Sequence, residues 1–62
     1  MVKKYLINNY TKGIFKKFNY ITFEKREGKN HLMIIDLSEL TGTEKILINK
    51  YIIEAGLEKR EV

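Results

Sequence analysis

The chain has 62 residues, no cysteine, a single histidine and a net charge of +4. A chain of this length forms one domain and buries only about 60% of its unfolded surface, so its stability is marginal. The composition excludes a disulfide framework and an ordinary zinc site, and no run of residues is long and apolar enough to cross a membrane. We therefore expect one folded cytoplasmic domain over residues 1–62, without a bound metal or cofactor.

The N-terminal segment, residues 2–10, is expected to form a strand that a turn at residues 11–13 connects to the following segment. Tyr, Ile and Asn are modest helix formers, and Gly13 would interrupt any longer helix. The alternative is a helix over residues 2–10, because the apolar residues there also lie near helical spacing. We prefer the strand, because a third strand stabilises a hairpin that would otherwise be isolated.

Residues 20–37 have the pattern of a β-hairpin. Two segments rich in β-branched, aromatic and aliphatic residues flank Gly28, which suits the first central position of a tight turn. With Gly28 and Lys29 as a two-residue loop, Phe23 would lie opposite Ile34. The side chains that this register turns toward the core are Ile21, Phe23, Leu32 and Ile34.

The C-terminal part of the chain predicts a helix over about residues 42–55. Thr41 and Glu44 fit a capping box, and Gly56 supplies a left-handed stop. Residues 58–62 are expected to form a frayed charged tail. The helix face that would cover the sheet consists of Leu47, Ile48, Tyr51, Ile52 and Ala55. The predicted fold class is therefore α+β, with a three-stranded antiparallel sheet, made of the hairpin and the N-terminal strand, packed on this one helix.

Two apolar features have no use in such a monomer. Ile46 and Ile53 point nearly opposite to the helix face that covers the sheet. Met33 and Ile35 point away from the predicted core face, so the run 32–35 is apolar on both sides, as in a strand that is covered twice. We expect a homodimer or a partner protein to cover these four residues.

Positive charge is concentrated in the first half of the chain. Residues 1–30 hold eight basic and two acidic side chains, whereas residues 31–62 hold four basic and six acidic ones. A basic half on a small domain is the electrostatic pattern expected of a protein that binds a polyanion.

A continuous strand over residues 14–26 would arrange some of these charges around aromatic rings. Lys16 and Arg26 would then share a face with Phe18 and Tyr20. Cations neutralise phosphates there, and rings can stack on bases. The predicted nucleic-acid-binding residues are Lys12, Lys16, Lys17, Phe18, Tyr20, Arg26 and Lys29.

No catalytic group can be assembled from the residue types present. His31 is the only imidazole and Ser38 the only serine, so no nucleophile with a base and an orienting third group is available. We expect neither enzyme activity nor a small-molecule substrate. His31 is expected to be a solvent-exposed strand residue beside the hairpin turn.

We therefore expect a small basic protein that binds nucleic acid, DNA before RNA, in a regulatory or accessory role. The preference rests on residues 1–23, which contain five lysines and no acid. The alternative is an interaction module, such as a virus- or plasmid-encoded inhibitor or adaptor, that docks an apolar sheet or helix face on a host protein. The abundance of Lys, Ile, Asn and Tyr fits an AT-rich genome and favours neither function.

Overall fold

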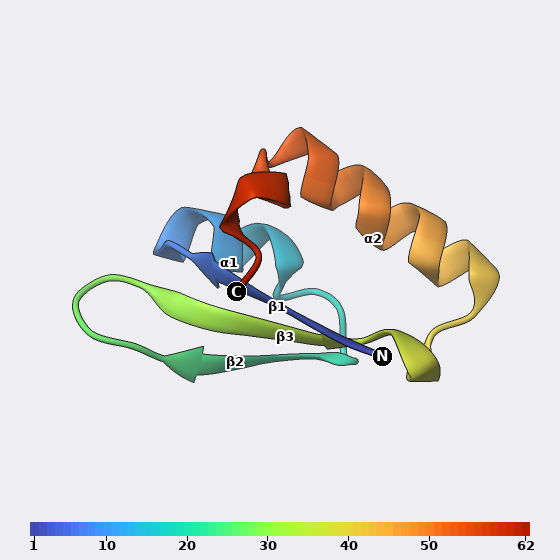
Figure 1. Ribbon diagram of the computed structural model, residues 1–62, viewed down its shortest axis with the longest axis horizontal. Coiled ribbons are helices and arrows are strands. Elements are labelled where there is room, and N and C mark those ends of the chain that lie inside the picture. The colour runs from blue at the N-terminus through green and yellow to red at the C-terminus, as the bar shows by residue number, and fades with distance from the viewer.

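The computed structural model describes all residues, 1–62, and confirms the α+β fold class. In chain order the elements are β1 (Val2–Ile7), α1 (Asn9–Phe15), β2 (Ile21–Lys25), β3 (His31–Asp36), the 3₁₀ turn η1 (Leu37–Glu39), α2 (Gly42–Glu54) and the 3₁₀ helix η2 (Leu57–Arg60). The strands form one antiparallel sheet in the order β1-β3-β2, so β3 lies in the centre. All the helices lie on one side of this sheet, and the other side is uncovered (Figure 1).

The hairpin of β2 and β3 forms as predicted, but its predicted register is wrong by one residue. The Arg26 N–H donates to the Asn30 carbonyl, so the loop is one residue longer than the two-residue turn that we expected, with Gly28 at φ 70°. Phe23 consequently lies opposite Met33 rather than Ile34. Because side chains alternate between the faces of a strand, this shift exchanges the two faces of β3.

The register defines two faces of the sheet. The helix-covered face carries Lys3, Tyr5, Ile7, Ile21, Phe23, Lys25, His31, Met33 and Ile35, and the open face carries Val2, Lys4, Leu6, Thr22, Glu24, Leu32, Ile34 and Asp36. Met33 and Ile35 are therefore core residues, while the predicted core residues Leu32 and Ile34 lie on the open face.

Helix α2 agrees closely with its prediction. The Glu44 N–H donates to the Thr41 hydroxyl and the Glu44 carboxylate accepts from the Thr41 N–H, which completes the capping box. Gly56 follows the helix in the left-handed conformation, at φ 67°. Of the five residues expected on the covered face of this helix, Ile48 and Ile52 are buried, while Leu47 is 39% exposed, so its placement was wrong.

The short helix α1 occupies a segment for which we predicted a turn and a strand. Asn8 caps this helix, because its side chain accepts from the Thr11 N–H. Phe15, at the last residue of α1, is completely buried and anchors the helix on the sheet. Strand β2 begins only at Ile21, so the predicted continuous strand over residues 14–26 does not form.

The C-terminal tail that we expected to fray is structured. Leu57 is buried at the start of η2, and Glu61 forms an isolated antiparallel bridge with Tyr5. The Val62 N–H donates to the Lys4 carbonyl at 2.9 Å. The tail thus covers part of the outer edge of β1, which reduces the unpaired backbone that an edge strand exposes.

Candidate nucleic-acid interface

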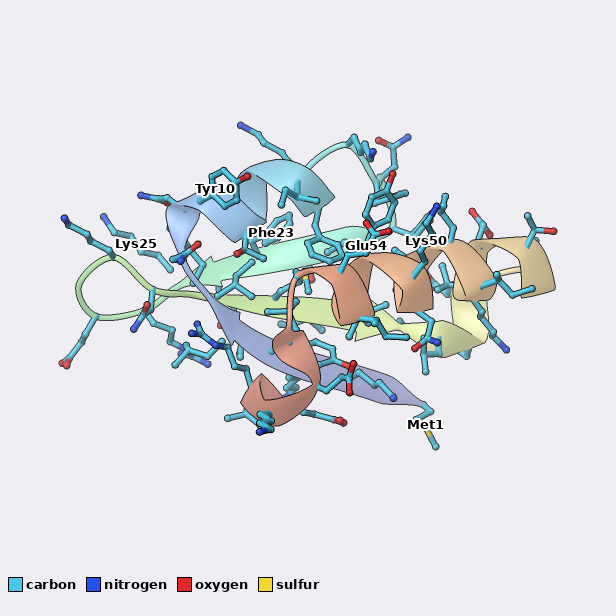
Figure 2. All side chains as sticks on the ribbon, turned by 90° about the horizontal axis from the view of Figure 1, so that it is seen from above. Met1, Tyr10, Phe23, Lys25, Lys50 and Glu54 are labelled. Atoms are coloured by element: carbon cyan, nitrogen blue, oxygen red, sulfur yellow. The ribbon has the colours of Figure 1, made fainter.

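Six cations lie on α1, on the turn after it and around the hairpin end, and we call them the basic surface. Its members are Lys12, Lys16, Lys17, Lys25, Arg26 and Lys29. All are exposed except Lys12, which is half-buried. Strand β1 ends and α1 begins at the hairpin end of the sheet, which brings α1 beside β2 (Figure 2). Residues that are distant in sequence therefore contribute to one side of the molecule.

His31 ties α1 to the base of the hairpin. Its Nε2 bonds to the Asn9 side-chain oxygen, and because that oxygen can only accept, Nε2 carries the hydrogen. His31 is only 9% exposed, so the prediction of a solvent-exposed histidine is wrong. Burial lowers the pKa of the imidazole, and the neighbouring ammonium groups of Lys12 and Lys25 lower it further. Lys12 and Lys25 therefore both lie near His31, and Lys25 is its cross-strand neighbour at the hairpin end of the sheet.

Two lysines of the basic surface are held against aromatic rings. The Lys17 Nζ donates to the Tyr51 hydroxyl at 2.9 Å and lies 4.5 Å from the centre of the Tyr51 ring. The Lys12 Nζ lies 5.6 Å from the centre of the Phe23 ring. Cation–π contacts of this kind fix where an ammonium group lies while leaving it free to bind an anion. The other cations are exposed: Lys16 follows α1 directly, next to Lys17, and Arg26 and Lys29 lie in the loop between β2 and β3.

The predicted stacking rings, Phe18 and Tyr20, are instead packed against other aromatic side chains. The Phe18 ring centre lies 5.7 Å from that of Tyr20 and 5.6 Å from that of Tyr51, while Phe15 lies 6.4 Å from Phe18. Both Phe18 and Tyr20 are half-buried. Burial also raises the pKa of the Tyr20 hydroxyl, as does the nearby Glu44 carboxylate. The two rings therefore stabilise the junction of α1 and α2 and do not form an open platform for bases.

Tyr10 is the exposed ring that the sequence analysis missed. It is 80% exposed on α1 and borders a groove of about 460 Å³ between α1 and α2. The groove is lined by Tyr10, Thr11, Ile14, Tyr51, Glu54 and Ala55. The available signal was Asn8, a favoured helix N-cap residue, which would have started a helix just before Tyr10.

The residues predicted to contact a partner fall into two groups. Met33 and Ile35 are fully buried in the core, so the prediction that they form a surface contact is wrong; the register explains why. Ile46 and Ile53 lie on the outer face of α2 and are 74% and 55% exposed. Ile46 also borders a cavity of about 300 Å³ lined by Lys3, Leu37, Lys45, Ile46, Ile48, Asn49 and Ile52.

No family model, curated protein or solved structure matches this chain. None of its helices is both long enough and apolar enough to pass through a membrane. No three His, Cys, Asp or Glu side chains lie together as a group that could hold a metal ion.

Proposed function

We propose that the protein binds nucleic acid through the basic surface. The observation that carries this proposal is the location of the net charge. Residues 8–31, which include α1 and the hairpin end, hold six basic and two acidic side chains, while the rest of the chain holds six of each. The entire excess of +4 therefore belongs to one continuous segment of the chain, which runs from the start of α1 to the start of β3. A cluster of this kind attracts phosphates and releases their counterions.

The arrangement of the cations suits contacts with a phosphate backbone rather than base-specific readout. Lys12 and Lys17 are positioned by aromatic rings, so binding would cost these two side chains less conformational entropy than free lysines. Lys16, Arg26 and Lys29 are exposed and can adjust to the spacing of successive phosphates. Affinity should therefore depend strongly on salt and weakly on base sequence.

The test is a titration of labelled duplex DNA, single-stranded DNA and RNA at two salt concentrations. The variant Lys16→Glu with Lys29→Glu removes two phosphate contacts and should abolish measurable binding. Its matched control, Lys45→Glu with Lys50→Glu, makes the same change in net charge on exposed positions of α2. Because both variants have the same total charge, a difference between them measures the location of the charge alone.

The salt dependence gives the number of contacts. For duplex DNA, each neutralised phosphate should change the binding constant by roughly 0.9 log units per log unit of salt, and for a single strand by roughly 0.7. If the folded wild-type chain binds no nucleic acid at low salt, the proposal is wrong. Docking on a host protein would then be the remaining candidate, through the exposed Ile46 and Ile53 of α2.

Tyr10 provides a separate test of how single strands bind. Its exposed ring lies on α1, the helix that also carries Lys12, and an unpaired base could stack on it. Tyr10→Ala should weaken single-strand binding by roughly 1–3 kcal/mol and leave duplex binding nearly unchanged. Phe18→Ala, in contrast, should lower the free energy of unfolding because that ring is packed among Phe15, Tyr20 and Tyr51. Equal losses for single strands and duplexes on Tyr10→Ala would argue against stacking.

A further inference from the structure

The open face of the sheet has an apolar centre with opposite charges on its two sides. The central strand β3 contributes Leu32, which is only 6% exposed, and the half-buried Ile34, and β1 adds Leu6, which is 37% exposed. Lys4 lies on the β1 side of this centre and Glu24 on the β2 side. Neither α-helix packs on this face (Figure 1), and only the end of η2 and the C-terminal residues border it, beside Leu6. An antiparallel sheet commonly leaves one face in water, but that face is then mainly polar, unlike the centre of this one.

We propose that a second copy of this chain covers the open face, with the two sheets packed face to face. The two-fold axis runs parallel to the strands, so that β1 of one copy lies over β2 of the other. Leu32 and Ile34 of both copies meet near the axis, because β3 is the central strand in each sheet. Sheets stacked in this way lie about 10 Å apart, with their inner side chains in contact.

The charges on the face select this orientation. Across the sheet, Lys4 lies in the row of Ile34 and Glu24 lies in the adjacent row of Leu32. When β1 lies over β2, Lys4 of each copy comes within reach of Glu24 of the other, which gives two symmetric ion pairs. A two-fold axis perpendicular to the strands would place β1 over β1. The open-face residues of β1 are Val2, Lys4 and Leu6, so Lys4 would face no acidic side chain of the opposing strand.

Asp36 is the remaining charged group of the open face, and its charge is already engaged within the monomer. Its Oδ1 accepts from the Ser38 N–H at 3.0 Å and from the Ser38 hydroxyl at 2.6 Å. These hydrogen bonds lower the pKa of the carboxyl, and the N-terminal ammonium group lowers it further. Asp36 also lies at the far end of β3, beside Val2, away from the apolar centre. It therefore does not oppose the packing of Leu32 and Ile34.

The size of the face sets the expected strength of the dimer. Three strands spaced about 4.8 Å apart and about 20 Å long form a face of roughly 300 Å². Stable protein interfaces bury about 800 Å² on each partner. We therefore expect a weak dimer that forms at micromolar to millimolar concentrations, and one that places the basic surfaces of both copies in one particle.

The experiment measures the mass of the full chain in solution by light scattering or sedimentation, from micromolar to millimolar concentration. The expected result is a mass that rises from monomer to dimer over this range. Lys4→Glu and Glu24→Lys should each weaken the dimer roughly tenfold, because each places like charges together twice. The double variant, Lys4→Glu with Glu24→Lys, should restore an affinity within about twofold of wild type, because it reverses both ion pairs. Lys50→Glu on α2 is the control and should change nothing.

Two outcomes would overturn the proposal. One is a chain that remains a monomer at every concentration. The other is a dimer whose interface lies elsewhere. That interface would be revealed if both single variants leave the dimer unchanged, or if Ile53→Glu on α2 disrupts it. Lys4 and Glu24 are exposed, so these variants are expected to fold, and circular dichroism spectra matching wild type would verify it.

Discussion

The two faces of the sheet are built from alternate residues of the same strands, yet they have different roles. On the helix-covered face, Tyr5, Met33 and Ile35 are at most 2% exposed and form the centre of the core. On the open face, Leu6 and Val2 of the edge strand remain 37% and 51% exposed, and only Leu32 in the centre is buried, at 6%. The chemical character of the side chains differs less than their burial does, because β3 carries aliphatic residues on both sides.

The contrast shows that the hydrophobicity of the β3 side chains does not by itself determine which face of β3 the helices cover. The choice depends on which side chains of β1 and β2 are aligned with it and on where the helices can pack. Ile21, Phe23 and Tyr5 align with Met33 and Ile35, so the large side chains of all three strands gather on one side. Phe15 and Ile48 from the helices complete that cluster. The open face keeps the smaller set of apolar residues, interrupted by Lys4, Thr22 and Glu24.

The largest expected effect comes from truncating one isoleucine on each face. Ile35→Ala creates a cavity under the helices and should lower the free energy of unfolding by about 2–5 kcal/mol. Ile34→Ala removes the same atoms from the open face and should cost only about 1 kcal/mol. Urea denaturation would measure both, at a protein concentration low enough to keep the chain monomeric.

Ile34 and Ile35 are adjacent and of the same type, so each variant is the control for the other. In a domain of this size the loss at Ile35 is comparable with the total stability, and the variant is expected to be largely unfolded. Equal losses at the two positions, or a larger loss at Ile34, would contradict the register that assigns Ile35 to the helix-covered face.

A smaller effect is expected from the buried histidine of the helix-covered face. The pKa of His31 is lowered in the folded state, so below its ordinary value of 6.5 the unfolded chain binds more protons than the folded one. The contribution of the neutral His31 to the free energy of unfolding should therefore be fully present above pH 6.5. The free energy of unfolding should fall as the pH decreases below that value. Denaturation curves measured between neutral pH and pH 5 would show this dependence.

The control is His31→Gln, which keeps a polar side chain and has no titration in this window. Its free energy of unfolding should be nearly constant over the same range. The pKa of Asp36 is also lowered, but from an ordinary value of 3.8, so its contribution is lost only at lower pH and does not interfere. A wild-type stability that is as flat as that of the variant would show that His31 is not buried in solution.

The sequence by itself determined those elements whose signals are local. The capping box at Thr41 and Glu44, the stop at Gly56 and the long apolar pattern between them specify α2 without reference to the rest of the chain. The two strands around Gly28 are equally clear, since β-branched and aromatic runs flank a turn residue. The concentration of positive charge in the first half is a property of composition, and it locates most of the basic surface.

Only the tertiary structure decided the register, the inner face and the surroundings of each candidate residue. One additional residue in the hairpin loop exchanged the faces of β3, and nothing in residues 27–30 distinguishes the two loop lengths decisively. Helix α1 is too short to be stable alone and depends on the burial of Phe15 against the sheet. Its formation moved Phe18 and Tyr20 from a predicted binding face into an aromatic cluster and left Tyr10 exposed. These outcomes depend on contacts between segments distant in sequence, which local propensity and periodicity do not encode.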